Sequence, residues 1–260
     1  MALRVCVLGS GSRGNCTYIG SGTTSILVDA GLSARETVKR LEQIGKAPED
    51  IRAVCVSHEH SDHVAGLRVL HTRHGIPLYA NAGTVEGVGR DVRMRELPWQ
   101  VFTNGSPFGI GDMTIEPFSV PHDAYDPVGF VIDAGGVRIG VVTDMGVPTT
   151  LVRERLKRCR VVVVEANHDE RMLKDAKRPW HLKQRIMGRQ GHLSNETVAG
   201  MLADIAGPDL DQVFLAHISD ECNEEYLAVQ TTESKLAKTG CTHVKVRATF
   251  ADRVSEVWAG

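Results

Sequence analysis

The stretch Ser57–His63, S-H-E-H-S-D-H, constrains this chain more than any other feature. It places three histidines and two acidic residues within six positions, although the chain has only 11 histidines in 260 residues. A buried strand is predicted over 52–57, and a helix is predicted to begin with Ser61 or Asp62 as its cap. The motif is therefore expected on a strand-to-helix loop, where a rigid scaffold can present functional side chains.

Imidazole and carboxylate groups at this spacing are typical of a transition-metal site. Neutral imidazole suits zinc, iron or manganese, and carboxylate is acceptable to each of these metals. His58 and His60 can point one way and share a metal, whereas Asp62 and His63 can turn the other way to a second metal. The plainer alternative is a solvated polar loop that caps a helix.

Further donors stand at the ends of apolar runs later in the chain. His122 follows F-S-V-P, Asp144 ends I-G-V-V-T-D, and His217 ends V-F-L-A-H. Each is weak evidence alone, because a single histidine at a strand end is more often a satisfied surface or core residue. Together they complete the ligand sets of two metals.

The pattern of apolar runs predicts one α/β domain over residues 1–260. Strand-like runs split by turn residues dominate early, and strands alternate with helices later. Ser33 with Glu36 begins one predicted helix, and Ser194 begins another whose apolar residues recur at helical spacing. The glycine-rich stretch 9–14 is followed by β-prone residues rather than a helix, which argues against a dinucleotide site.

Composition favours a cytoplasmic protein without a membrane span or signal peptide. No apolar run approaches the length of a spanning helix. The six cysteines form no C-x-x-C pair, which argues against a zinc ribbon or a disulfide scaffold. The formal net charge of −2 gives no global attraction to nucleic acid, so such binding requires a local basic patch.

Five ordered motifs resemble those of the metallo-β-lactamase superfamily: I-L-V-D-A-G, S-H-E-H-S-D-H, V-P-H-D-A-Y-D-P-V-G-F, V-V-T-D and F-L-A-H-I-S. The resemblance covers nearly the whole chain. It implies a four-layer αβ/βα sandwich, with two mixed sheets face to face and helices outside. It also implies two divalent metal ions, zinc, manganese or iron. The implied ligands are His58, His60 and His122 for one metal, Asp62, His63 and His217 for the other, and Asp144 as the bridge. Asp29 is the implied acid that orients the motif loop from behind.

The C-terminal half resembles the nuclease side of that superfamily. V-E-A-N-H-D, G-H-L-S-N-E-T-V-A-G-M-L-A-D-I and L-A-H-I-S are similar, in order, to three motifs of transfer-RNA 3′-processing enzymes. With V-L-G-S-G-S-R-G-N-C-T-Y-I at the front, the order is most similar to the YycJ (WalJ) branch, whose members are described as DNA exonucleases. The resemblance implies that His192 is a catalytic histidine outside the ligand set and that Glu165 supports it.

Residues 171–192 are the candidate contact with nucleic acid. Their basic residues are Arg171, Lys174, Lys177, Arg178, Lys183, Arg185 and Arg189, with Trp180 and His181 interleaved. The predicted substrate contacts are His192, Ser194, Asn195, Lys183 and Arg185. A helix that begins after Ser194 would offer free N–H groups and the positive end of its dipole to a phosphate. The alternative is an ordinary solvated helix face.

These observations predict a two-metal phosphodiesterase, with a DNA exonuclease as the leading interpretation. Two metals about 3.5–4 Å apart can share a hydroxide at neutral pH and clamp a phosphoryl oxygen. Asp62 can orient that hydroxide, and His192 can neutralise the phosphate or protonate the leaving oxygen.

Several alternatives stay open. Within the same fold they are a ribonuclease and a hydrolase of a small phosphodiester, a thioester or a lactam. A diiron oxidoreductase would show an acid where this chain has His60, and the complete ligand set argues against a metal-binding module without catalysis. The native metal, the polarity of cleavage and the oligomeric state are left undetermined, as is contact of substrate with the loop from Gly9 to Asn15.

Overall fold

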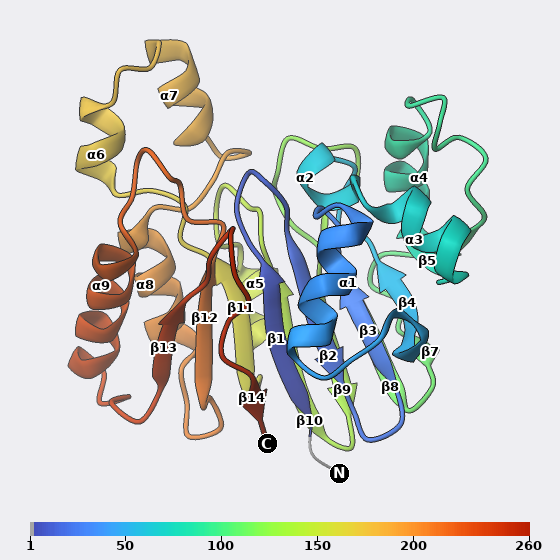
Figure 1. Ribbon diagram of the computed structural model, residues 1–260. Helices are drawn as coiled ribbons and strands as arrows, with labels where there is room; N and C mark the ends of the chain where they lie inside the picture. The colour runs from blue at the N-terminus through green and yellow to red at the C-terminus, as the bar shows by residue number, and fades with distance from the viewer. Residues whose placement is uncertain (1–2) are drawn as a thin grey trace. The chain divides into compact units, whose positions relative to one another are not determined.

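The computed structural model describes residues 3–260, and its strands belong to two mixed sheets of seven strands each (Figure 1). This confirms the predicted α/β class. The chain divides into two compact units. Unit 1 comprises residues 3–119, 124–137 and 250–260, and unit 2 comprises residues 120–123 and 138–249. The prediction of a single domain over 1–260 is not tested by this division and stays a prediction.

Unit 1 contains the whole of the first sheet, whose strand order is β14-β1-β2-β3-β4-β5-β6. The strands are β1 (Arg4–Gly9), β2 (Cys16–Gly20), β3 (Ser25–Val28), β4 (Ile51–Cys55), β5 (Leu78–Asn81), β6 (Trp99–Phe102) and β14 (Trp258–Ala259). The early hairpins pair antiparallel, as predicted, whereas β3 to β6 pair parallel through crossover connections. Unit 1 also contributes an antiparallel ladder to the second sheet, made of β7 (Phe108–Ile110), β8 (Met113–Ser119) and β9 (Val128–Ala134).

The helices of unit 1 follow its parallel strands. They are α1 (Ala34–Gln43), the 3₁₀ helix η1 (Pro48–Asp50), α2 (Ser61–Val64), α3 (Leu67–His74) and α4 (Ala82–Val88). Ser33 caps α1 by accepting a hydrogen bond from the Glu36 N–H at 3.2 Å, as predicted.

The predicted helix after the metal motif is divided into α2 and α3, and its N-cap is His60 rather than Ser61 or Asp62. The division occurs at Gly66, whose N–H donates to the Ala30 carbonyl at 2.8 Å. A Cβ atom at this position would lie 2.3 Å from the Leu32 carbonyl oxygen. The close approach of these two backbones therefore interrupts the helix and draws the motif loop toward the end of β3.

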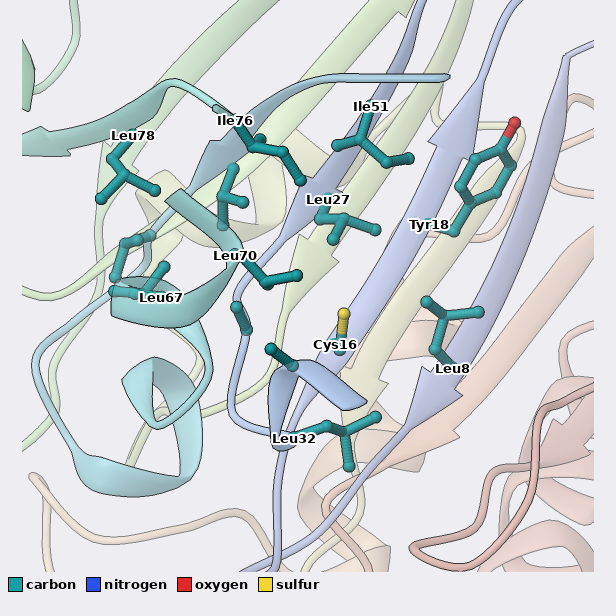
Figure 2. Packing of buried hydrophobic residues seen from close by; sticks show 14 of the residues in the cluster. Leu8, Cys16, Tyr18, Leu27, Leu32, Ile51, Leu67, Leu70, Ile76 and Leu78 are labelled. Carbon is teal, nitrogen blue, oxygen red and sulfur yellow. The ribbon is translucent and has the colours of Figure 1, made fainter. Parts of the chain in front are cut away.

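Buried apolar side chains of unit 1 pack into one core (Figure 2), which includes Val56 and Val64 on either side of the metal motif. Leu27 comes from β3, and Leu67 and Leu70 come from α3; all three are fully buried. Because the loop runs between β4 and α2, it is held at both ends by this packing. Truncation of such a leucine to alanine typically costs about 2–5 kcal/mol.

Unit 2 is built on parallel strands in the order β10-β11-β12-β13. The strands are β10 (Val137–Val142), β11 (Val161–Glu165), β12 (Gln212–Ala216) and β13 (Lys245–Ala248). The helices are α5 (Thr150–Leu156), α6 (Glu170–Asp175), α7 (Trp180–Ile186), α8 (Asn195–Ile205) and α9 (Glu225–Lys238). The β11 run V-V-V-V-E is buried throughout, as expected for a parallel strand covered on both faces.

The carboxyl ends of these parallel strands meet at one edge of the sheet. Asp144 follows β10, Glu165 ends β11, and His217 follows β12. The chain between β11 and α8 forms the excursion that carries α6 and α7. Over residues 3–260, no helix has the length and the apolar character needed to cross a membrane.

Candidate metal and phosphodiester site

The motif loop of unit 1 brings two histidine nitrogens together. Nε2 of His58 lies 3.1 Å from Nδ1 of His60. Nδ1 of His58 lies 3.0 Å from Oγ of Ser57, a hydroxyl that itself donates to Asp29 at 2.8 Å. His58 can therefore donate its Nδ1 proton to Ser57 and keep the Nε2 lone pair for a ligand.

Asp29 lies behind His63. Its Oδ2 is 2.8 Å from Nδ1 of His63, and its Oδ1 accepts the Ser57 N–H at 2.7 Å. Asp29 has a φ of 61°, a left-handed conformation that costs free energy in a residue other than glycine. The carboxylate fixes the proton on Nδ1, so the lone pair lies on Nε2, which is the tautomer of metal-ligating histidines.

Asn15 connects the glycine-rich loop to two candidate ligands. Its Nδ2 lies 3.1 Å from Oδ2 of Asp62 and 3.0 Å from Nε2 of His63. Sequence reasoning could place Asn15 only as a residue that could touch substrate. Its partners are about 47 residues away in the sequence, so no local pattern could have identified them.

A second group of donors lies in unit 2. Ligand atoms of Asp144, Glu165, His192 and His217 all lie within 4.8 Å of one another. Nε2 of His217 is 3.5 Å from Oδ1 of Asp144. His217 has a positive φ of 49°, a left-handed conformation that costs free energy in a residue other than glycine, as at Asp29 in unit 1.

His122 is also buried in unit 2, and its ring lies beside that of His192, with 5.2 Å between centroids. Its Nδ1 lies 3.1 Å from the Gly191 carbonyl oxygen. Since a carbonyl can only accept, Nδ1 carries the proton and Nε2 carries the lone pair. This is again the tautomer that His122 needs in order to bind a metal through Nε2.

Glu165 and His192 form a pair in which the carboxyl group is buried and the imidazole is partly exposed. The Glu165 carboxyl group is fully buried; its Oε1 accepts the Met145 N–H at 2.5 Å, and its Oε2 lies 2.9 Å from Nδ1 of His192. Burial raises the pKa of Glu165, against the lowering effect of His192. Burial lowers the pKa of His192, but the charge and hydrogen bond of Glu165 outweigh it and raise that pKa to about 9. The Glu165 carboxyl group therefore favours the imidazolium form of His192, whose Nδ1 is already engaged.

The geometry of the donors fits transition metals. Two donor atoms bound at about 2.0–2.1 Å to one tetrahedral ion lie about 3.3 Å apart. Within unit 1, the separations are 3.1 Å for His58 and His60 and 3.5 Å for Asp62 and His63. Within unit 2, the separation for Asp144 and His217 is 3.5 Å. The pairs His58–His60 and Asp144–His217 can thus share an ion with little rearrangement, whereas Nε2 of His63 must first give up its contact with the Asn15 amide.

Most of the other residues predicted to contact substrate form hydrogen bonds to groups within the protein. Ser194 caps α8 by accepting the Thr197 N–H at 3.2 Å. Asn195 is fully buried, and its amide pairs with the amide of Asn223 in both directions, at 2.8 and 2.9 Å. Lys183 is buried too, and its Nζ donates to the Lys174 carbonyl at 2.5 Å. These contacts hold the turn and the two short helices, and they leave no exposed amide or ammonium group for a phosphate.

Arg185 is the exposed member of that predicted set. Its Nε donates to Oδ2 of Asp123 at 2.7 Å, and Oδ1 of the same carboxylate lies 3.4 Å from Nε2 of His122. The carboxylate that pairs with Arg185 thus lies next to a candidate metal ligand. Other basic side chains of the segment also face acids; these pairs are Arg171–Asp175, Lys174–Glu170 and Arg178–Glu221. The basic segment therefore has a weaker positive potential than its sequence suggests.

The fold and the donor groups define a metal-dependent hydrolase of the metallo-β-lactamase fold. The chain is similar to the metallo-β-lactamase fold protein YhfI from Bacillus subtilis, with a TM-score of 0.76 and 16% identity over 100% of both chains. It is also similar to Zn²⁺-bound PqqB from Methylobacterium extorquens, with a TM-score of 0.68 and 18% identity over 97% of this chain and 99% of that one.

The family is shown by the sequence itself. The model of the beta-lactamase superfamily domain matches residues 24–218, and the chain belongs to that superfamily. The chain is 33% identical over 243 residues to the exodeoxyribonuclease YycJ of Bacillus anthracis, which covers 92% of this chain and 91% of the relative. These findings confirm the superfamily and the similarity to the YycJ (WalJ) branch.

Proposed function

We propose that this chain is a two-metal phosphodiesterase that removes nucleotides from an end of DNA. The observation that carries the proposal is the Glu165–His192 pair at 2.9 Å, because it supplies a proton donor next to candidate metal ligands. The name of the relative from Bacillus anthracis, an exodeoxyribonuclease, supports DNA as the substrate.

The proposed ligand assignment follows the family motifs and the donor chemistry. It gives one metal to His58, His60 and His122, the other to Asp62, His63 and His217, and both to Asp144. The metals are divalent ions, zinc or manganese, or else iron. When bound, two such ions supply a nucleophile at neutral pH and Lewis-acid stabilisation of the phosphoryl oxygens.

The side chains around the metals then have separate tasks. Asp29 holds the His63 ring through Nδ1, and Asp62 orients the nucleophile in line with phosphorus. Because Glu165 engages Nδ1 of His192, the Nε2–H of the imidazolium is the end that can donate a proton to the leaving oxygen. The same positive charge can neutralise the phosphate before cleavage.

Contact with the DNA backbone is assigned chiefly to His192 and Arg185. We keep Ser194, Asn195 and Lys183 as residues that shape this region, since their polar groups have partners inside the protein. A cytoplasmic location remains a prediction from the scattered cysteines. Contact with nucleic acid through the segment of α6 and α7 likewise remains a proposal.

The experiment is metal-free protein refilled with manganese, zinc or iron and tested on DNA and RNA labelled at either end. We expect release of mononucleotides from DNA, loss of activity with chelator, and little activity on RNA. The exposed His243→Ala variant is a matched control for His192→Ala in the same unit. Hydrolysis of thioesters or lactams without any phosphodiester cleavage would overturn the proposal, and preferred cleavage of RNA would make the enzyme a ribonuclease.

A further inference from the structure

The indole of Trp180 in unit 2 is left exposed by the fold. The residue is 60% exposed, and over residues 3–260 its ring has no stacking or cation–π partner. Tryptophan is a large apolar side chain that usually buries much of its surface. The helix α7 begins at Trp180 and packs through Lys183, Leu182 and Ile186, which are buried or partly buried. The indole is therefore not needed to hold the helix in place.

The other end of α7 lies beside a candidate metal ligand of unit 2. Arg185 pairs with Asp123, whose Oδ1 is 3.4 Å from Nε2 of His122. After the helix, the chain passes close to the loop that follows β10, because a Cβ atom at Gly146 would lie 2.3 Å from the Arg189 carbonyl oxygen. The helix α7 thus runs from the exposed indole to the site.

The length of α7 sets how far along a DNA strand the indole can act. An α-helix rises 1.5 Å per residue, so the Cα atom of Trp180 lies about 7.5 Å along the axis from that of Arg185. Helical side chains also tilt toward the N-terminus, which here is the end away from Arg185. Successive nucleotides of one strand are about 3.4 Å apart. At this spacing a strand held at the site reaches the indole about two nucleotides further on.

Few positive charges of the segment 171–192 remain available for phosphates. Its residues that pair with acids are Arg171, Lys174, Arg178 and Arg185. Lys177 and Arg189 are exposed and form no ion pair with any residue of 3–260. One free aromatic ring with two free cations is a combination that binds nucleic acid by stacking more than by charge. Stacking on a side chain requires a base that is not already stacked within a duplex.

We propose that Trp180 is a binding residue for single-stranded DNA, on which a base about two nucleotides from the reacting phosphate stacks. The proposal rests on the function proposed above and narrows its substrate to a single-stranded end. Lys177 and Arg189 contact phosphates of the same strand.

A membrane surface is the other partner that an exposed tryptophan beside cations could suit. Helices that lie on a membrane present a wide apolar face. Within 171–192, the exposed large apolar residues are Trp180 and Met187. They stand seven residues apart among polar neighbours, so the surface favours a nucleic acid strand.

The test is binding of a phosphorothioate oligothymidylate, which resists cleavage, to the metal-loaded protein, measured by fluorescence anisotropy. In Trp180→Ala we expect binding about 5–150-fold weaker, which corresponds to about 1–3 kcal/mol for one stacked base. Trp180→Phe keeps an aromatic face and should restore most of the affinity. The matched control is Tyr226→Ala, which removes a 65% exposed aromatic residue of α9 in the same unit and should bind like the wild type.

Two further substrates separate stacking from support of the fold. In Trp180→Ala, the KM for single-stranded DNA should rise by the same factor, whereas hydrolysis of bis(p-nitrophenyl) phosphate should stay at the wild-type rate because this substrate cannot reach the indole. Binding of a blunt duplex should not change. Equal losses on all three substrates would mean that Trp180 only supports the fold.

Unchanged binding of oligothymidylate by Trp180→Ala would overturn the proposal. If anionic lipid vesicles then bind the wild type but not the variant, the residue belongs to a membrane contact instead.

The free cations give an independent measurement. Each phosphate contact to a single strand contributes about 0.7 to the slope of log K against the logarithm of the salt concentration. Lys177→Ala should therefore flatten this slope by about 0.7, and an unchanged slope would refute the contact of Lys177 with a phosphate.

Failure of this proposal is distinguishable from failure of the proposed function. A wild-type protein that binds oligothymidylate through Trp180 but cleaves no phosphodiester refutes the function and leaves the binding site standing. A protein that cleaves single-stranded DNA equally well with and without the indole refutes only the role of Trp180.

Discussion

Replacement of His192 by alanine should abolish most DNA cleavage without removing metal. Nδ1 of His192 is engaged by Glu165 at 2.9 Å, so the proposed role of this residue is proton donation rather than metal binding. A positioned acid or base contributes about 10²–10⁴-fold to a rate. At 1.36 kcal/mol for each factor of ten, this corresponds to a loss of about 3–5 kcal/mol in transition-state stabilisation.

The same variant should lose some stability for a separate reason. Glu165 is fully buried and would keep the Met145 N–H as a partner but lose His192. A buried polar group that loses one partner costs about 1–3 kcal/mol. The raised pKa of Glu165 limits this cost, because the carboxyl group can become neutral. Kinetics should therefore be measured well below the melting temperature of the variant.

The assay compares labelled DNA with bis(p-nitrophenyl) phosphate, alongside metal analysis of each variant. Nitrophenolate needs little protonation as it leaves, so the loss on this substrate should be clearly smaller than on DNA. His243→Ala should behave like the wild type on both substrates. Equal losses on both substrates would refute proton donation and favour phosphate binding, and loss of a metal from His192→Ala would mean that His192 is a ligand.

Three further predictions concern the metals, the substrate class and pH. Asp144→Ala should lose both metals in mass spectrometry, and full metal retention would contradict its bridging role. The metal-loaded enzyme should hydrolyse bis(p-nitrophenyl) phosphate but not a β-lactam, as measured by absorbance in the presence and absence of chelator. His168, whose pKa is lowered by burial from 6.5 to about 4, should destabilise the fold in acid. Above pH 6.5 His168 is neutral in the folded and the unfolded state, so it does not lower the free energy of unfolding. As the pH falls toward 4, the unfolded state takes up a proton that the folded state does not, and the free energy of unfolding falls by about 3 kcal/mol in total. The stability of His168→Gln should fall less over this range in denaturant titrations, and an unchanged slope would exclude His168 as the cause.

The candidate metal ligands could be identified from the sequence because each of them belongs to a recognisable local sequence pattern. The S-H-E-H-S-D-H motif gathers four donors at a strand-to-helix junction, His58 and His60 in the loop after β4 and Asp62 and His63 within α2. Asp144, Glu165 and His217 stand where apolar runs end, and parallel strands bring their carboxyl ends to one edge. Helix caps at Ser33 and Ser194 were predictable for the same reason, since the capping residue and its partner N–H are only three residues apart.

Other features depended on contacts between residues that are distant in the chain. The pairing of Arg185 with Asp123 spans 62 residues, and that of Arg178 with Glu221 spans 43, so the sequence overstated the free positive charge of this segment. The predicted helix was also divided into α2 and α3, because the close approach of Gly66 to the Leu32 carbonyl interrupts it.

Local composition thus determined which residue types could bind metal and on which elements they lie. Only the tertiary structure decided the hydrogen-bond partners that set the tautomer of His63 and the orientation of Asp62. Asn15 illustrates the difference: its neighbours in the sequence describe a tight turn, whereas its amide bonds to residues 47 and 48 positions away. Hydrogen bonds are directional and short, so the role of a buried polar side chain follows from which groups the folded backbone brings within about 3 Å of it.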